Sequence, residues 1–310
     1  MHSKNGSLRG SVLLFITAFI WGTAFVAQSV STDFVGPFTF NMARSVLGGA
    51  FLIPVILLMG AGRKKKSASC PSGAPDAPAE DRKALWTGGI CCGAILFVAS
   101  NLQQWGLQYT TAGKAGFITA LYILLVPIFS IFLHKKAGIR LWISVAIAVV
   151  GLYFLCMTES FTIQKGDFIE MLCAVAFTFH ILVIDHFSPR VDGVKMSCIQ
   201  FWVAALLSGI GMLLAEDPDW SMIFAAWFPI CYVGIMSSGV AYTLQIVGQK
   251  DLNPTVASLI MSLESVIAAL SAWVLIHQNM SGREVLGCIL MFAAIILAQL
   301  PERTPVKSEN

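Results

Sequence analysis

One carboxylate interrupts an otherwise apolar segment at residues 258–271, which reads SLIMSLESVIAALS. Glu264 stands in its middle, and about ten residues on each side carry no other charge. A neutral carboxylic acid costs less to bury than a carboxylate, and a residue in this setting could exchange a proton or bind a substrate ammonium group. It could equally stay hydrogen-bonded to a neighbouring helix and hold the two together. The sequence leaves both readings open.

Two further titratable residues lie in apolar segments. Arg44 cannot easily lose its proton, so it needs a carboxylate, carbonyl groups or water nearby; Glu264 and Glu170 are the candidate partners. It could instead reach outward to the membrane surface or contact a substrate carboxylate. His180 could relay protons, or it could be a core histidine with satisfied hydrogen bonds. We group Arg44 and His180 with Glu264 as candidates for coupling or charge balance.

Polar and aromatic side chains recur at helical spacing in two other segments. Asn101, Gln104, Trp105 and Gln108 follow the i, i+3, i+4, i+7 pattern of one helix face. Such a face lines a cavity or forms hydrogen bonds between helices, and amides and indoles suit an uncharged or zwitterionic metabolite. A second segment, 223–248, carries Tyr242 and Gln245 at helical spacing. Trp21 and Tyr122, in two other segments, complete the candidate substrate-binding set.

The elements that must position these residues are membrane helices. The chain is 56% hydrophobic and 12% charged, against about 25% charged in soluble domains. A bilayer core needs about 20 apolar residues per helix. Ten runs meet this need, and we predict an all-α protein with spans at residues 9–29, 36–59, 84–108, 112–133, 140–157, 166–187, 194–215, 223–248, 254–276 and 283–301.

The positive charges predict the orientation. With a cytoplasmic N-terminus, sixteen of the twenty Lys and Arg residues fall on the inner side, three fall on the outer side, and Arg44 lies inside a span. This bias follows the positive-inside rule, so we expect residues 1–8 and 302–310 to be cytoplasmic. Residues 62–83, rich in Pro, Ser and charge, read as a disordered cytoplasmic linker.

Several classes of function find no support in the chain. A net charge of +3 without a basic aromatic stripe gives no sign of nucleic-acid binding. Seven of the eight cysteines lie in apolar runs, without the spacing of metal ligands. No phosphate-binding G-x-x-x-x-G-K-[ST] loop and no catalytic motif occurs, so we expect no cofactor, no metal and no enzyme activity.

The two halves of the sequence show weak similarity. A shift of 156 residues brings Gly10 onto Gly166 and Trp21 onto Phe177, and a shift of 141 brings Gln104 onto Gln245. Five spans per half is an odd number, so the halves, 9–157 and 158–301, would lie inverted in the membrane. Inverted repeats with a substrate site between them are typical of secondary transporters.

Four segments together resemble the EamA-type members of the drug/metabolite transporter superfamily. They are FIWGTAFVAQ (19–28), VGPFTFNMARSVLGG (35–49), LQYTTAGKAGFITALYILLVPIF (107–129) and PTVASLIMSLESVIAALSAWVL (254–275). The resemblance covers all ten spans and implies two inverted five-helix halves and export of amino acids, sugars or other small metabolites.

The sequence departs from the family pattern in two places. The family has Glu-Pro where this chain has Glu264-Ser265, so the proline kink expected there is lost, while Pro127 keeps one in 112–133. His277-Gln278 also replaces an acidic residue at the end of the ninth span.

We therefore expect an inner-membrane secondary transporter that works by alternating access. Its cavity would lie between spans 1, 3, 4, 6, 8 and 9, and its partners would be a small metabolite, the bilayer and, if Glu264 is a coupling residue, protons. The alternative is an intramembrane enzyme or sensor without transport activity.

Overall fold

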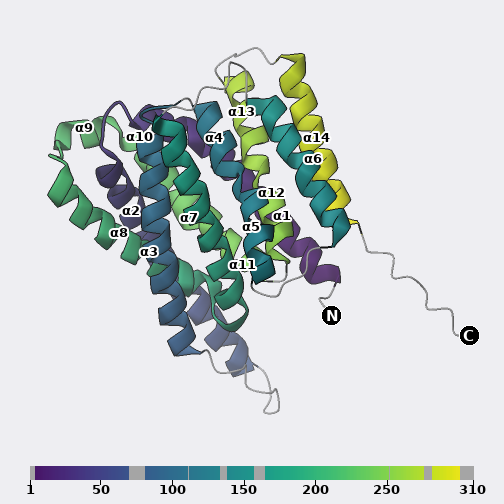
Figure 1. The fold of residues 1–310 in the computed structure, drawn as a ribbon. Helices are drawn as coiled ribbons and strands as arrows, with labels where there is room; N and C mark the ends of the chain where they lie inside the picture. Colours follow the sequence, from purple (N-terminus) through teal and green to yellow (C-terminus); the bar gives the residue numbers. More distant parts are fainter. Residues whose placement is uncertain are drawn as a thin grey trace, which may run out of the picture.

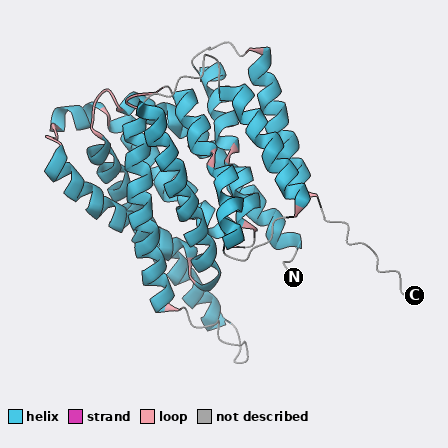
Figure 2. Ribbon diagram, viewed as in Figure 1, coloured by secondary structure: helices cyan, strands magenta, loops and turns pink. Residues whose placement is uncertain are grey.

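A computed structural model describes residues 4–69, 81–110, 112–132, 138–156, 165–250, 252–275 and 281–300. In this part of the chain every regular element is a helix (Figure 2). Nine of the helices are α1 (Lys4–Ser31), α2 (Pro37–Ser69), α3 (Arg82–Gly106), α4 (Ala112–Ala120), α5 (Tyr122–Phe132), α6 (Ile139–Cys156), α7 (Lys165–Phe187), the 3₁₀ turn η1 (Ser188–Arg190) and α8 (Gly193–Ala215). The rest are α9 (Trp220–Ala225), α10 (Trp227–Tyr232), the π-helix η2 (Val233–Ala241), α11 (Tyr242–Gln249), α12 (Pro254–Met261), α13 (Leu263–Leu275) and α14 (Gly282–Gln299).

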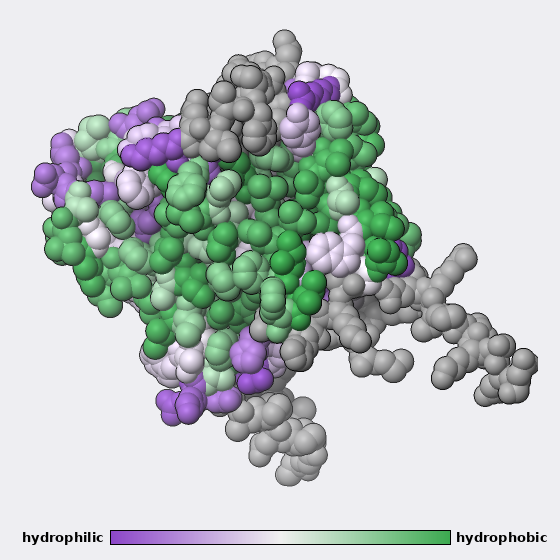
Figure 3. Space-filling view, in the orientation of Figure 1, coloured by the Kyte–Doolittle hydropathy of each residue, from purple (hydrophilic) through white to green (hydrophobic). Residues whose placement is uncertain are grey.

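Eight helical segments of the described chain are long and apolar enough to cross a membrane. On the face shown in Figure 3, a broad hydrophobic belt covers the middle, and polar residues gather toward the two ends. The fifth and tenth predicted spans correspond to α6 and α14, which have 18 residues each and pack against each other. These two helices lie outside the eight, so ten spans remain a prediction.

The helices run between two sides of the bundle, which we call the upper and lower sides after their places in Figure 1. Helices α1 and α3 begin on the lower side, and α14 ends there. Helices α2, α4 and α7 begin on the upper side, where α8 ends. Helix α2 continues to Ser69, into the first part of the expected linker, because its Arg, Lys and Ala residues are good helix formers. Residues 70–80 lie outside the described part.

Two predicted spans are each interrupted in the middle. Residues 112–133 contain α4 and α5, separated at Leu121, and residues 254–276 contain α12 and α13, separated at Ser262 (Figure 2). The prediction that the ninth span loses its kink along with the proline is therefore wrong. The hydroxyl of Ser262 donates to the Leu259 carbonyl at 2.7 Å, and that of Ser258 donates to the Thr255 carbonyl at 2.9 Å. Serine hydroxyls bound to the preceding turn favour bending of a helix.

Close helix contacts depend on glycines. A Cβ atom on Gly22 of α1 would stand 2.7 Å from the Glu264 carbonyl oxygen of α13, and one on Gly93 of α3 would stand 2.6 Å from the Gln200 carbonyl of α8. These distances are shorter than van der Waals contact, so only glycine permits the approach. Small residues at helix contacts are the usual means of tight packing between membrane helices.

Candidate functional site

A small cavity lies at the centre of the bundle, next to the interruptions of α4/α5 and α12/α13. It is lined by residues of nine elements: Trp21, Phe25, Gln28, Arg44, Gln103, Thr119, Tyr122, Phe177, Ser237, Tyr242 and Glu264. Its volume is about 30 Å³. Such a space holds water but is far smaller than the pockets that take metabolites. In this conformation the cavity is therefore too small to hold a metabolite.

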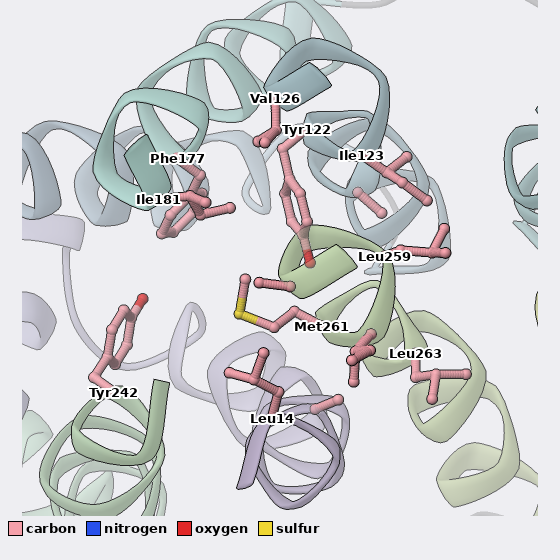
Figure 4. Close-up of a cluster of buried hydrophobic side chains, with 14 of the residues drawn as sticks. Leu14, Tyr122, Ile123, Val126, Phe177, Ile181, Tyr242, Leu259, Met261 and Leu263 are labelled. Carbon is pink, nitrogen blue, oxygen red and sulfur yellow. The ribbon is translucent and has the colours of Figure 1, made fainter. Parts of the chain in front are cut away.

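Glu264 is 5% exposed and accepts a hydrogen bond from the Tyr122 hydroxyl at 3.1 Å. Both residues directly follow a helix interruption, Tyr122 after Leu121 and Glu264 after Ser262 and Leu263. Figure 4 shows the side chain of Tyr122 pointing from its helix toward the segment that carries Met261 and Leu263. The bond therefore links the two interrupted helices where their backbones change direction.

Arg44 of α2 is 3% exposed and lines the cavity. Its guanidinium donates to Gln28 Oε1 at 3.1 Å and forms a further hydrogen bond with the hydroxyl of Tyr242. Neither of the two carboxylates considered as partners from the sequence fills that role: Glu264 accepts from Tyr122, and Glu170 accepts from Thr119. The cavity thus holds one cation and one carboxylate whose hydrogen-bond partners are neutral.

Aromatic rings form one wall of the cavity. The rings of Trp21 and Tyr242 lie 4.7 Å apart between centroids, tilted by 58°. His180 meets Tyr242 edge to face at 5.8 Å. The Trp21 indole Nε1 is buried and has no hydrogen-bond partner. An unpaired buried donor beside a cavity is costly, so this group is available to a bound molecule.

The structure brings five of the predicted site residues together at this cavity. They are Trp21, Arg44, Tyr122, Tyr242 and Glu264. Three others are buried outside its lining: His180 bonds Gln200 Oε1 at 3.2 Å, Gln104 donates to the Gln28 carbonyl at 3.2 Å, and Gln245 is 1% exposed.

The predicted polar face of α3 is divided between different surroundings. Asn101 accepts from Asn41 at 3.2 Å and donates to Ser208 at 3.2 Å, so it joins α2, α3 and α8. Trp105 and Gln108 are exposed, and Trp105 lines a surface groove together with Phe38. The α-helix ends at Gly106, so the helical spacing does not extend to Gln108.

Gln103 does not belong to the predicted polar face, yet it lines the cavity. The lining also includes residues outside the predicted site set, which are Phe25, Gln28, Thr119, Phe177 and Ser237. Gln103 stands beside Gln104, and both are buried because α3 packs against α7 and α8. The rotation of α3 about its own axis decides that Gln103 lines the cavity while Gln104 bonds α1. Ser237 belongs to η2, and π-helical turns are frequent at functional sites.

A sequence model of the EamA-like transporter family matches residues 8–157 and again residues 164–300. The chain belongs to the EamA-like transporter family. It is accordingly a multi-pass membrane protein, and its family indicates membrane transport.

Individual relatives agree with this assignment. An uncharacterized transporter of Archaeoglobus fulgidus is 28% identical over 290 residues, which cover 93% of this chain and 84% of that protein. The uncharacterized transporter YoaV of Bacillus subtilis is 20% identical over 90% of this chain and 92% of its own length. A crystal structure with 21% identity superimposes with a TM-score of 0.75 over 94% of this chain and 96% of the other, which shows a shared fold.

Proposed function

We propose that this family member is an inner-membrane secondary transporter that exports small polar or amphipathic metabolites, amino acids or related compounds, by alternating access. The observation that carries the proposal is the small central cavity, which receives Arg44 from the first half of the chain and Glu264 from the second. A zwitterion offers a carboxylate to the first and an ammonium group to the second. The rings of Trp21 and Tyr242 would contact its apolar part.

The helix contacts support two inverted five-helix halves. Helix α6 packs on α14 and α2 packs on α8. Helix α3 packs on α7 as the segment η2–α11 packs on α1. Helices α4 and α5 pack on α7 as α12 and α13 pack on α1. Exchange of the halves 9–157 and 158–301 by a two-fold axis reproduces this set of contacts. In such transporters the substrate site lies where interrupted helices of the two halves meet.

The proposed orientation places the lower side in the cytoplasm. The start of α1 and the end of α14 lie on that side (Figure 1). The basic residues at the end of α2 are there as well, as the positive-inside rule requires. The upper side would then face outward, and export would carry the substrate from the lower to the upper side.

A ligand screen tests the site directly. Amino acids, their amides, sugars and nucleosides would be tested for thermal stabilisation of the purified protein in detergent. A ligand that binds only the folded state raises stability by about 2.7 kcal/mol at a hundred times its Kd. We expect zwitterionic amino acids to stabilise the protein and their amides, which lack the carboxylate, to have little effect.

Two tryptophan variants provide the control for location. Trp21→Ala should abolish the stabilisation because Trp21 lines the cavity, whereas Trp105→Ala should keep it because Trp105 faces a surface groove. Counterflow of a stabilising amino acid in liposomes then separates a transporter from an enzyme or a sensor. If Trp105→Ala lost binding and Trp21→Ala retained it, the central cavity would be the wrong site.

A further inference from the structure

A second buried carboxyl group lies outside the lining of the central cavity. Glu170 of α7 is fully buried. It stands about one and a half turns after the start of this helix on the upper side. Neither the proposed substrate contacts nor the link between the interrupted helices uses it. A carboxyl group inside a membrane protein is costly and marks a functional position more often than a packing position.

Glu170 is enclosed by three helices. The Thr119 hydroxyl of α4 donates to Glu170 Oε2 at 2.7 Å, while Oε1 is buried without a hydrogen-bond partner. The carboxyl group lies against Gly106 of α3, where even a Cβ atom would collide with it. One oxygen is thus bonded toward the cavity side, and the other is free to hold a proton.

The contact between α1 and α11 corresponds to the contact between α7 and α3 when the two halves are exchanged, and it is built with an apolar side chain. Gly10 of α1 packs on the carbonyl of Gly248 in α11, and a Cβ atom on Gly248 would stand 3.2 Å from the Leu14 side chain. In the contact between α7 and α3, Gly166 packs on the carbonyl of Gly106, and the Glu170 side chain covers Gly106. Leucine therefore satisfies the packing of such a contact. The carboxyl group at the second contact needs a chemical reason.

Polar groups connect Glu170 in both directions. Toward the centre, Thr119 lines the cavity. Toward the upper side, Asp167 precedes Glu170 by one turn, is 2% exposed, and accepts a hydrogen bond from the Thr110 hydroxyl at 2.8 Å. Thr110 is half-buried in the segment that follows α3. These side chains form a polar series from the upper surface to the cavity through an otherwise apolar region.

The groups that face Glu170 leave its charge uncompensated by a cation. Among the described side chains, the titratable groups around it are Asp167 and Cys173, both on α7. Helices α3 and α4 present Gly106 and Thr119. A neutral carboxylic acid is cheaper to bury than a carboxylate in such surroundings.

We propose that Glu170 is a proton-binding residue through which protons pass between the upper face and the central cavity. A proton arriving from the upper face by way of Asp167 binds Glu170 at the unpaired Oε1. The carboxyl group then turns so that this proton faces Thr119 Oγ1, and the Thr119 hydroxyl turns toward the cavity. Glu170 passes its proton to Oγ1 while Thr119 gives its own hydroxyl proton to an acceptor in the cavity, so one proton enters, one leaves, and Glu170 is again a carboxylate. The inference rests on the proposed function in taking the cavity as the transport site, and it adds a coupling residue on α7.

Infrared spectroscopy of the protein in liposomes tests proton binding without any ligand. The carbonyl-stretch band of protonated carboxyl groups would be recorded from acidic to alkaline pH for wild type, Glu170→Gln and Glu264→Gln. We expect a pH-dependent component that disappears in Glu170→Gln and persists in Glu264→Gln. If no pH-dependent component distinguishes wild type from Glu170→Gln, Glu170 does not exchange a proton and the proposal is overturned.

Transport measurements test whether the proton is used. Liposomes would be supplied with a radiolabelled mixture of L-amino acids, either at equal pH to follow counterflow or with a pH gradient to follow accumulation. We expect Glu170→Gln to keep counterflow and to lose about tenfold or more of the gradient-driven accumulation, a typical size for the coupling between two ligands. Equal accumulation in wild type and Glu170→Gln would overturn the proposal.

The infrared titration and the transport measurements together distinguish failure of this inference from failure of the proposed function. Absence of amino-acid counterflow in wild type would contradict the proposed function, while the infrared titration still reports on Glu170. Glu170→Leu serves as the second variant because Leu14 fills the corresponding contact. If neither Glu170→Gln nor Glu170→Leu folds, the carboxyl group is required for structure, and the proposal is wrong.

Discussion

At the scale of single residues, the hydrogen bond from Tyr122 to Glu264 decides how the cavity is built. It joins α5 to α13 at 3.1 Å between two residues that are almost completely buried. A hydrogen bond between membrane helices contributes on average about 0.6 kcal/mol and at most about 1.7 kcal/mol. The bond is therefore weak enough to break during a transport cycle and strong enough to define the resting arrangement.

We expect Tyr122→Phe and Glu264→Gln each to destabilise the protein, because each leaves a buried polar partner with a poorer bond. The double variant should lose less than the sum, with a coupling of about 0.5–1.7 kcal/mol. Unfolding in mixed detergent micelles, titrated with SDS, measures the cycle. Strict additivity would show that the two side chains do not interact.

Arg44 gives a second prediction at this scale. Arg44→Lys retains the charge but loses the planar group that donates to Gln28 and can hold a carboxylate with two parallel bonds. We expect it to reduce binding of zwitterionic amino acids by about tenfold or more, the effect of losing one charge-assisted hydrogen bond. Thermal stabilisation by the same ligands measures it. Unchanged binding would remove Arg44 from the substrate site.

At the scale of elements, glycines set how closely helices approach the cavity. A Cβ atom on Gly22 of α1 would stand less than 3 Å from Ile267 and from the Glu264 carbonyl of α13. A Cβ atom on Gly60 of α2 would meet nothing within 4 Å. The two positions offer the same substitution in opposite surroundings. The comparison isolates helix packing from helix propensity.

We predict that Gly22→Ala lowers stability by about 1–3 kcal/mol through overpacking and shifts α13 together with Glu264. Gly60→Ala should be neutral or stabilising by up to about 1 kcal/mol, because alanine is the better helix former. Apparent melting temperatures in detergent distinguish them. Equal effects of the two variants would contradict the close approach of α1 and α13.

At the scale of the whole molecule, one side chain ties the two halves together on the upper side. Glu216, at the end of α8, accepts hydrogen bonds from the backbone N–H groups of Phe38 and Thr39 at 2.9 and 2.8 Å, and from the Thr39 hydroxyl at 2.6 Å. It thereby caps the N-terminus of α2 from another helix. On the lower side Asp192 caps its own helix, α8.

Because the proposed alternating access must separate the halves on one side at a time, we expect loss of this link to favour opening of the upper side. In a variant without native cysteines, Gln103→Cys at the cavity should react faster with an impermeant thiol reagent added to the upper side when Glu216→Ala is present. Asp219→Ala is the control, because Asp219 caps only α9, through Ser221. Equal labelling rates in the two backgrounds would show that Glu216 does not hold this side closed.

The sequence by itself determined the features that depend on local composition. A helix that crosses a bilayer must match its thickness with apolar residues, so the membrane helices, the family and the isolated position of Glu264 can be read from the chain. Five of the residues that line the cavity were predicted for the same reason, since polar and aromatic groups stand out in apolar runs.

Only the tertiary structure decided how these residues are used. The separation at Ser262, the bond of Arg44 to Gln28 rather than to a carboxylate, and the place of Gln103 at the cavity all depend on contacts between distant segments. Helices buried on several sides have no single polar face, so periodicity cannot tell which amide meets the cavity and which meets a neighbouring helix. The phase of α3 was therefore fixed by packing, which put Gln103 inside and Trp105 at the surface.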